Sequence, residues 1–359
     1  MKNFCVNPFY AKASYTNDYD LPCCLVGPAD DDYSREVIQQ HFNKDIKSPY
    51  CHICWRDEAN GITSRRQWDN RWISWHSGKD LDTLIEERHT PKLLSLQYKT
   101  SNLCNLACKT CYSIDSTRWY AEDSHYGKYN KVGVDVNDHN KVTDKDLSTL
   151  TFLEILGGEP FLDVHHLALL ERLVQLENTN LHINYTTNGQ QMPSKKLQNL
   201  LNKFDKVQIN LSVDGLDKVF EYLRYPGSWK KLVEVMNELK QTKHKITCYT
   251  TLSNMNVFYF DTLLEWVYKN FAINDFRYQF VYDPKELAVN VMPTDLKNKI
   301  TEKFVNHKFN AFLKPILKSI QPRTNTPLLE KFKDTISKQD SYRKLDPSNF
   351  VPEIVEYLY

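Results

Sequence analysis

The segment 93–111 reads LLSLQYKTSNLCNLACKTC and joins a β-rich run to three closely spaced cysteines. Residues 93–98 are short, mainly apolar and aromatic, which predicts a β-strand. Three thiols follow within eight residues, at Cys104, Cys108 and Cys111. Because α/β proteins carry their chemistry at the carboxyl ends of parallel strands, the segment predicts a reactive site directly after the first strand of a sheet.

Five further β-rich runs follow this segment and alternate with helical patterns. The runs cover residues 152–156, 181–187, 207–213, 246–252 and 276–282. The stretches between them space their apolar residues as helices do, as at Trp229, Leu232, Val233 and Met236. Repeated βα units predict a parallel sheet covered by helices. With six such units, we expect an α/β fold of the partial, open (β/α)6 barrel type.

The chain divides into three regions by composition. Residues 1–90 are rich in turn-forming residues and hold five cysteines, so they are predicted to form a separate small domain. Residues 91–292 carry the βα pattern. After Pro293 the pattern becomes helical, which predicts a helical extension over residues 293–359.

Charge and hydropathy exclude several classes of protein. The 46 Lys and Arg residues against 45 Asp and Glu residues give a net charge of +1, so no basic clamp for nucleic acid is expected. No apolar run approaches the roughly 20 residues of a membrane span, and the first residues lack a secretory signal pattern. A cytoplasmic protein without a membrane or nucleic-acid partner is therefore predicted.

The nine cysteines fall into groups, which favours metal ligation over disulfide bonds in a cytoplasmic chain. Three thiolates on one loop would leave one iron of a [4Fe–4S] cluster open to a small molecule. A structural zinc site completed by histidine or water is the alternative interpretation. Cys248, inside an expected strand, is interpreted as a small buried hydrophobic residue.

The three-cysteine segment and a glycine motif resemble those of the radical S-adenosylmethionine (SAM) superfamily. Cys104, Cys108 and Cys111 follow its Cys-x-x-x-Cys-x-x-Cys spacing, and Gly157-Gly158-Glu159 is similar to its Gly-Gly-Glu motif after the second strand. The resemblance implies a SAM-binding [4Fe–4S] cluster on the three cysteines. Two glycines allow close backbone approach, and the Glu159 carboxylate can accept hydrogen bonds from the SAM ammonium.

Other strand ends supply further residues that the resemblance assigns to SAM. Ser212 and Arg224 would hold the methionyl carboxylate, and Asn188 would line the ribose side. Many members carry an aromatic residue before the third cysteine, where this chain has Thr110, and Tyr112 is expected to substitute for it. Asn-Gly and Asp-Gly pairs at these strand ends are also common turn formers, which is the alternative interpretation.

The first cysteine group resembles a twitch-type auxiliary cluster domain, related to SPASM domains. A subgroup with this domain at the N-terminal side, common in phages, is similar to the chain nearly end to end. The resemblance implies a second [4Fe–4S] cluster on Cys5, Cys23, Cys51 and Cys54, with Cys24 as a rival for the second position. A structural zinc site with four cysteines is the alternative. For a phage-encoded protein the location would be the host cytoplasm.

The resemblance implies reductive cleavage of SAM to methionine and a 5′-deoxyadenosyl radical, which abstracts a hydrogen from a substrate. A peptide or protein is the expected substrate, and an external flavodoxin or ferredoxin the expected electron donor. A nucleotide or sugar substrate is the alternative within this class. From another class, a non-catalytic metal-binding module would bind its partner through the arginines and tryptophans between Arg65 and Trp75.

Overall fold

The computed structural model describes residues 1–16, 20–26, 34–128, 133–321 and 324–359. The chain forms two compact units. The first comprises Met1–Leu103, Val134–Thr186 and Pro193–Ile209, and the second comprises Cys104–Gly133, Thr187–Met192 and Asn210–Tyr359. The described helices include none that combines the length and apolarity needed to cross a bilayer.

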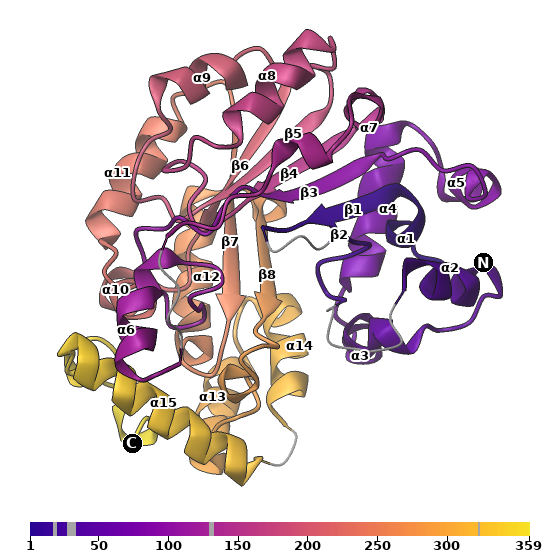
Figure 1. Ribbon diagram of the computed structural model, residues 1–359. Coiled ribbons are helices and arrows are strands. Elements are labelled where there is room, and N and C mark those ends of the chain that lie inside the picture. The colour runs from indigo at the N-terminus through magenta and orange to yellow at the C-terminus, as the bar shows by residue number, and fades with distance from the viewer. Residues whose placement is uncertain (17–19, 27–33, 129–132, 322–323) are drawn as a thin grey trace. The chain divides into compact units, whose positions relative to one another are not determined.

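The first unit contains a mainly parallel sheet (Figure 1). Strands β3 (Ser95–Lys99), β4 (Phe152–Leu156) and β5 (His182–Thr187) pair in parallel, with Gln97 opposite Glu154 and Glu154 opposite Asn184. Strand β1 (Ala11–Ser14) pairs in parallel with β3, and β2 (Asp20–Leu21) pairs antiparallel with β1. Strand β6 (Lys206–Ser212) follows β5 in the sheet order and continues into the second unit.

Apolar helix faces cover this sheet and fill the N-terminal region of the first unit. Helices α8 (Leu167–Gln175) and α9 (Lys195–Leu201) bury leucines, including Leu170 and Leu197, which are at most 1% exposed. A second core gathers Phe4, Ile38, Phe42 and Leu84. The helices around this core are α1 (Asn7–Tyr10), α2 (Arg35–Asn43), α3 (His52–Ala59), α4 (Arg65–Ser77) and α5 (Leu81–Glu87). Helix α7 (Asp144–Thr149) precedes β4.

The second unit contains the end of β6, together with the parallel strands β7 (Lys245–Leu252) and β8 (Phe276–Phe280). Cys248, in β7, is buried as predicted. The helices of this unit are α6 (Tyr120–His125), α10 (Asp217–Leu223), α11 (Trp229–Leu239), α12 (Phe260–Asn270), α13 (Thr294–Phe304), α14 (Asn310–Ile320) and α15 (Thr326–Arg343). Short 3-10 helices cover Pro49–Cys51, Thr117–Trp119, His139–Lys141, Val257–Tyr259, Ile273–Asp275, Lys285–Leu287, Pro347–Asn349 and Val355–Tyr357.

The six predicted strands are all present, which confirms the predicted α/β class of a partial (β/α) barrel. The predicted run 152–156 matches β4, and the other runs agree with their strands to within a few residues. The sequence analysis missed β1 and β2. They contain four and two residues, too few for an alternating pattern to stand out from the surrounding turn residues.

Candidate functional site

The three-cysteine loop (residues 104–111) lies in the second unit and is fixed by the end of α10 and the segment that follows it. The backbone N–H of Ala107 donates to the carbonyl of Tyr225 at 2.6 Å, and that of Lys109 donates to the carbonyl of Leu223 at 2.8 Å. Within the loop, the N–H of Cys111 donates to the carbonyl of Cys108 at 3.0 Å. These bonds place the loop beside Arg224, which a purely local sequence pattern could not show.

The three thiols of this loop influence one another electrostatically. Burial raises the pKa of Cys111, and the charges of Asp115, Cys108 and Cys104 raise it further. Burial also raises the pKa of Cys108, whereas Arg224 acts to lower it. Each thiolate makes deprotonation of the next thiol less favourable. All three thiols would therefore deprotonate together only when they bind a cationic centre.

The donor set of the loop suits an iron–sulfur cluster. Within the described residues, no group of three or more His, Cys, Asp or Glu side chains is arranged to hold a metal ion as it stands. The loop nevertheless offers three soft thiols, and the Leu106 N–H donates to the sulfur of Cys104 at 3.4 Å. Thiolates that accept backbone hydrogen bonds are the ligands such clusters use, so these residues fit the group.

Arg224 connects the loop to the end of β6. Its Nη2 lies 2.8 Å from the Asp214 carboxylate, and its Nη1 lies 4.0 Å from the Cys108 sulfur. Burial alone would lower the pKa of Arg224, but the charges of Asp214 and Cys108 raise it. Its buried Nε has no hydrogen-bond partner within the residues that the structure describes. A charged guanidinium with a spare donor fits an added carboxylate.

Two other predicted SAM residues lie in the same unit. Asn188 Nδ2 donates to Asn105 Oδ1 at 2.8 Å and lies 3.9 Å from the Cys104 sulfur, so the structure brings Asn188 onto the loop. Ser212 is buried at the end of β6. Both belong with Arg224 to one compact unit.

Tyr112 has a partner that the sequence analysis missed. Its hydroxyl donates to Asp283 Oδ2 at 2.6 Å, just beyond the end of β8. The sequence could have identified Asp283 as a candidate site residue, because it directly follows the sixth predicted strand. The adenine contact of Tyr112 stays a prediction.

The Gly-Gly-Glu motif lies in the first unit and packs against the chain that leads into the loop. The Gly158 N–H donates to the Ser101 carbonyl at 2.8 Å, and the Glu159 N–H donates to the Leu103 carbonyl at 2.7 Å. A Cβ atom at Gly158 would lie 2.3 Å from the Leu103 carbonyl oxygen. Glycine is therefore required here for close approach, and the neighbouring group is protein backbone. The Glu159 side chain is buried, and its Oε1 accepts from the Phe161 N–H.

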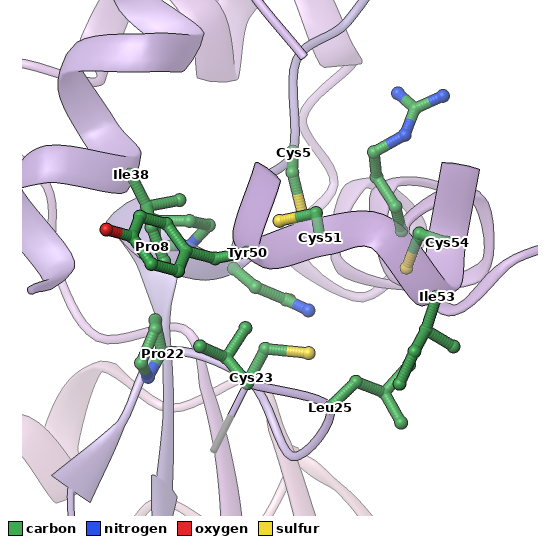
Figure 2. A pocket seen from close by; sticks show the side chains of 13 residues that line it. Cys5, Pro8, Pro22, Cys23, Leu25, Ile38, Tyr50, Cys51, Ile53 and Cys54 are labelled. Carbon is green, nitrogen blue, oxygen red and sulfur yellow. The ribbon is translucent and has the colours of Figure 1, made fainter. Parts of the chain in front are cut away.

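The four cysteines predicted for an auxiliary cluster line one pocket of the first unit. Figure 2 shows Cys5, Cys23, Cys51 and Cys54 around it. Burial raises the pKa of Cys51 to about 11 and that of Cys54 to about 12. Cys24 does not line this pocket.

Helix α4 holds the cysteine-bearing segments around this pocket. Arg66 makes two hydrogen bonds to the Glu58 carboxylate, at 3.0 and 2.8 Å, and donates to the Phe4 carbonyl at 2.8 Å. Asn70 donates to the same carbonyl at 2.9 Å, and its Oδ1 accepts from the Val6 N–H. Because Phe4 and Val6 flank Cys5, α4 fixes the position of that thiol.

The segment from Arg65 to Trp75, considered above as a binding surface, is largely internal to the first unit. Arg65 pairs with Asp69 at 2.7 Å and with Glu154 at 3.2 Å. Trp72 packs edge-on against Phe152, whereas Trp75 is 70% exposed. Most of this helix therefore serves packing. The sequence analysis missed Asn70, because its partners Val6 and Phe4 are 64 and 66 positions away along the chain.

Comparison with known proteins yields one family and several solved structures. Residues 98–267 match the family model of the radical SAM superfamily. No curated protein sequence matches the chain. Native anSMEcpe with bound AdoMet is 16% identical over 61% of this chain and 62% of that one, with a TM-score of 0.45. Native anSMEcpe with bound AdoMet and Kp18Cys peptide is 17% identical over 61% of each chain, with a TM-score of 0.43.

A third solved structure is SuiB from Streptococcus suis bound to S-adenosylmethionine, which is 15% identical over 78% of this chain and 61% of that one, with a TM-score of 0.43. The chain spans about three fifths of the length of these matched structures. The family match runs from the end of β3 into α12 and includes the three-cysteine loop and the Gly-Gly-Glu motif. Residues 98–267 are therefore similar to a radical SAM superfamily domain.

Proposed function

We propose that the chain reductively cleaves SAM at a [4Fe–4S] cluster held by Cys104, Cys108 and Cys111. When bound, the cluster and SAM supply one-electron chemistry that yields methionine and a 5′-deoxyadenosyl radical. The observation that carries the proposal is Arg224, a cation with an 11% exposed side chain that approaches Cys108 and keeps its Nε without a described partner. A carboxylate bound beside the cluster would satisfy that donor.

The residues of the chain orient the cofactor and exclude water. Arg224 would hold the methionyl carboxylate with Ser212, while Asp214 fixes the plane of the guanidinium. Asn188, which contacts the loop through Asn105, would face the ribose. Glu159 would accept hydrogen bonds from the SAM ammonium, and Gly157 and Gly158 complete the motif on which this assignment rests. The burial of these polar groups reduces their exchange with water and strengthens their electrostatic interactions.

We also propose that Cys5, Cys23, Cys51 and Cys54 hold a second [4Fe–4S] cluster, in a twitch-type domain formed by residues 1–90. Their arrangement around one pocket supports this assignment. Four thiolates would leave no open iron, so this cluster would transfer electrons or stabilise the domain rather than bind SAM. We propose the same division for the rest of the chain, with the radical SAM barrel over residues 91–292 and a helical extension over residues 293–359.

A peptide or protein is the proposed substrate, from which the radical would abstract a hydrogen atom. This step rests on the resemblance of the cysteine pattern to twitch-type proteins. An external flavodoxin or ferredoxin would supply the electron. The direct test is anaerobic incubation with SAM, dithionite and a library of peptides, followed by mass spectrometry for peptides that lose hydrogen or form cross-links.

Metal analysis tests the two cluster assignments. After anaerobic reconstitution, we expect about eight iron atoms per wild-type chain, and about four both in Cys104→Ala/Cys108→Ala/Cys111→Ala and in Cys5→Ala/Cys23→Ala/Cys51→Ala/Cys54→Ala. Only the first variant should lose all formation of 5′-deoxyadenosine from SAM. Zinc at both sites, with no SAM cleavage by the wild-type protein, would overturn the proposal.

A further inference from the structure

Lys109 stands between two of the predicted cluster ligands, Cys108 and Cys111, and its side chain is fully buried. A lysine on a loop normally keeps its ammonium group in water. Removing that charge from water is unfavourable unless a partner compensates it. The structure supplies such a partner from a distant part of the same compact unit.

The partner is Asp340 on helix α15, which is 3% exposed at its side chain. Lys109 Nζ donates to Asp340 Oδ1 at 2.6 Å. The other oxygen, Oδ2, accepts from the Tyr222 hydroxyl at 2.7 Å and from the Tyr359 hydroxyl at 2.8 Å. Both oxygens of the carboxylate are therefore hydrogen-bonded, which fixes the direction in which it can accept the ammonium.

The backbone of Lys109 is held as firmly as its side chain. Its N–H donates to the Leu223 carbonyl, at the end of α10, at 2.8 Å. Its Nζ lies 4.2 Å from the centre of the Tyr222 ring. Lys109 thus connects the three-cysteine loop to α10 through its backbone and to α15 through its ammonium. Cys108, which directly precedes it, can move little without breaking one of these contacts.

We propose that Lys109 is a positioning residue for the SAM-binding cluster, and that the Lys109–Asp340 ion pair sets how firmly the three-cysteine loop retains it. The inference rests on the cluster proposed above for Cys104, Cys108 and Cys111. Residues of the C-terminal region, Asp340 and Tyr359, thereby control a site to which they contribute no ligand.

The chemistry of the pair argues for positioning rather than for general stabilisation. A buried ion pair seldom adds stability over an apolar pair of similar volume, which could fill the same space. What it adds is direction, because each hydrogen bond constrains both partners. The loop between two metal ligands is where a directional constraint has the greatest effect on ligand geometry.

The test compares four variants of the full chain: Lys109→Met, Asp340→Asn, their double variant, and Lys331→Met as a matched control. Lys331 lies on α15 with its Nζ 3.1 Å from the buried Glu286 carboxylate, but its side chain is 61% exposed and none of its described contacts involves the loop, so it controls for the loss of a lysine ion pair on this helix. Three quantities are measured: thermal unfolding of the apo-chain, the rate of iron release to a chelator, and the EPR signal of the reduced cluster with and without SAM.

We expect the double variant to regain much of the thermal stability that either single variant loses, because no buried charge is left without a partner. Iron release should remain about tenfold faster than in the wild type, as for other residues that orient metal ligands, and the SAM-induced EPR change should be altered. Lys331→Met should release iron at the wild-type rate.

Iron release that simply follows thermal stability across the four variants would overturn the inference, as would a wild-type rate and EPR signal in the double variant. A wild-type chain that takes up no iron at the three cysteines would instead overturn the proposed function, and this inference with it. The two failures are therefore distinguishable in one set of measurements.

Discussion

The Nη2 atom of Arg224 lies 2.8 Å from the buried carboxylate of Asp214, and this ion pair sits at the edge of the three-cysteine loop. The pair leaves the Arg224 Nε available, since no described residue accepts from it. The guanidinium is thus both held in place and able to bind another anion.

Replacement of Arg224 by Gln should weaken SAM binding without removing the cluster. Loss of a charge-assisted hydrogen bond costs about 1.5–3 kcal/mol, which corresponds to roughly 10–100-fold in affinity. Titration calorimetry of the reconstituted protein with SAM measures the change. The matched control is Arg118→Gln, an arginine of the same unit in the Thr117–Trp119 turn. Wild-type affinity in Arg224→Gln would contradict the assigned role.

Cys23 and Cys24 should differ in their effect on iron content. Cys23 lines the four-cysteine pocket and Cys24 does not belong to its lining, so Cys23→Ser should lose the second cluster and Cys24→Ser should keep it. Iron and sulfide analysis after reconstitution distinguishes them, with about four iron atoms expected for the first variant and about eight for the second. The opposite result would assign the ligand role to Cys24.

Gly158→Ala should destabilise the first unit because the added Cβ would meet the Leu103 carbonyl oxygen at 2.3 Å. Backbone on both sides cannot give way easily, so a loss of about 3 kcal/mol in the free energy of unfolding is expected. Gly127→Ala is a useful comparison, since it meets nothing within 4 Å and only its φ of +67° opposes a side chain. That variant should lose about 1 kcal/mol. Equal losses would show that close approach is unimportant at Gly158.

His166 should make the chain less stable in mild acid. It is fully buried at the start of α8, and burial lowers its pKa to about 4, although Asp163 acts in the opposite direction. In the unfolded chain a histidine has a pKa of about 6.5, so the unfolded state takes up the proton first as the pH falls. The stability contributed by neutral His166 is present above about pH 6.5 and is lost towards pH 4, by about 3 kcal/mol.

Urea unfolding at several pH values tests this expectation. His166→Phe should flatten the decline in unfolding free energy between about pH 6.5 and 4. Part of the decline should remain, because burial also lowers the pKa of His76 to about 4. His89→Gln removes an exposed imidazole of the same unit and serves as the control. An unchanged slope in His166→Phe would refute the assignment.

Local sequence determined the strands and the thiol-bearing segments of this protein. The run at 152–156 predicted β4 because it is short and rich in apolar and aromatic residues, a property of neighbouring residues. The spacing of Cys104, Cys108 and Cys111 is also a local property, and it placed three potential ligands on one loop. The four cysteines around the auxiliary pocket were also named from sequence, but only through resemblance to a known family.

The tertiary structure decided how these segments are held and which partners they receive. Lys109 and Asp340 are separated by 231 positions, and no periodic pattern links them. Cys23 lines the four-cysteine pocket and Cys24 does not, although their thiols are in hydrogen-bonding contact, and no sequence pattern separates the two. Hydrogen bonds and ion pairs between distant segments exist only once the chain has folded. The sequence by itself therefore determined the ligand types, whereas their geometry and their buried counter-charges came from the fold.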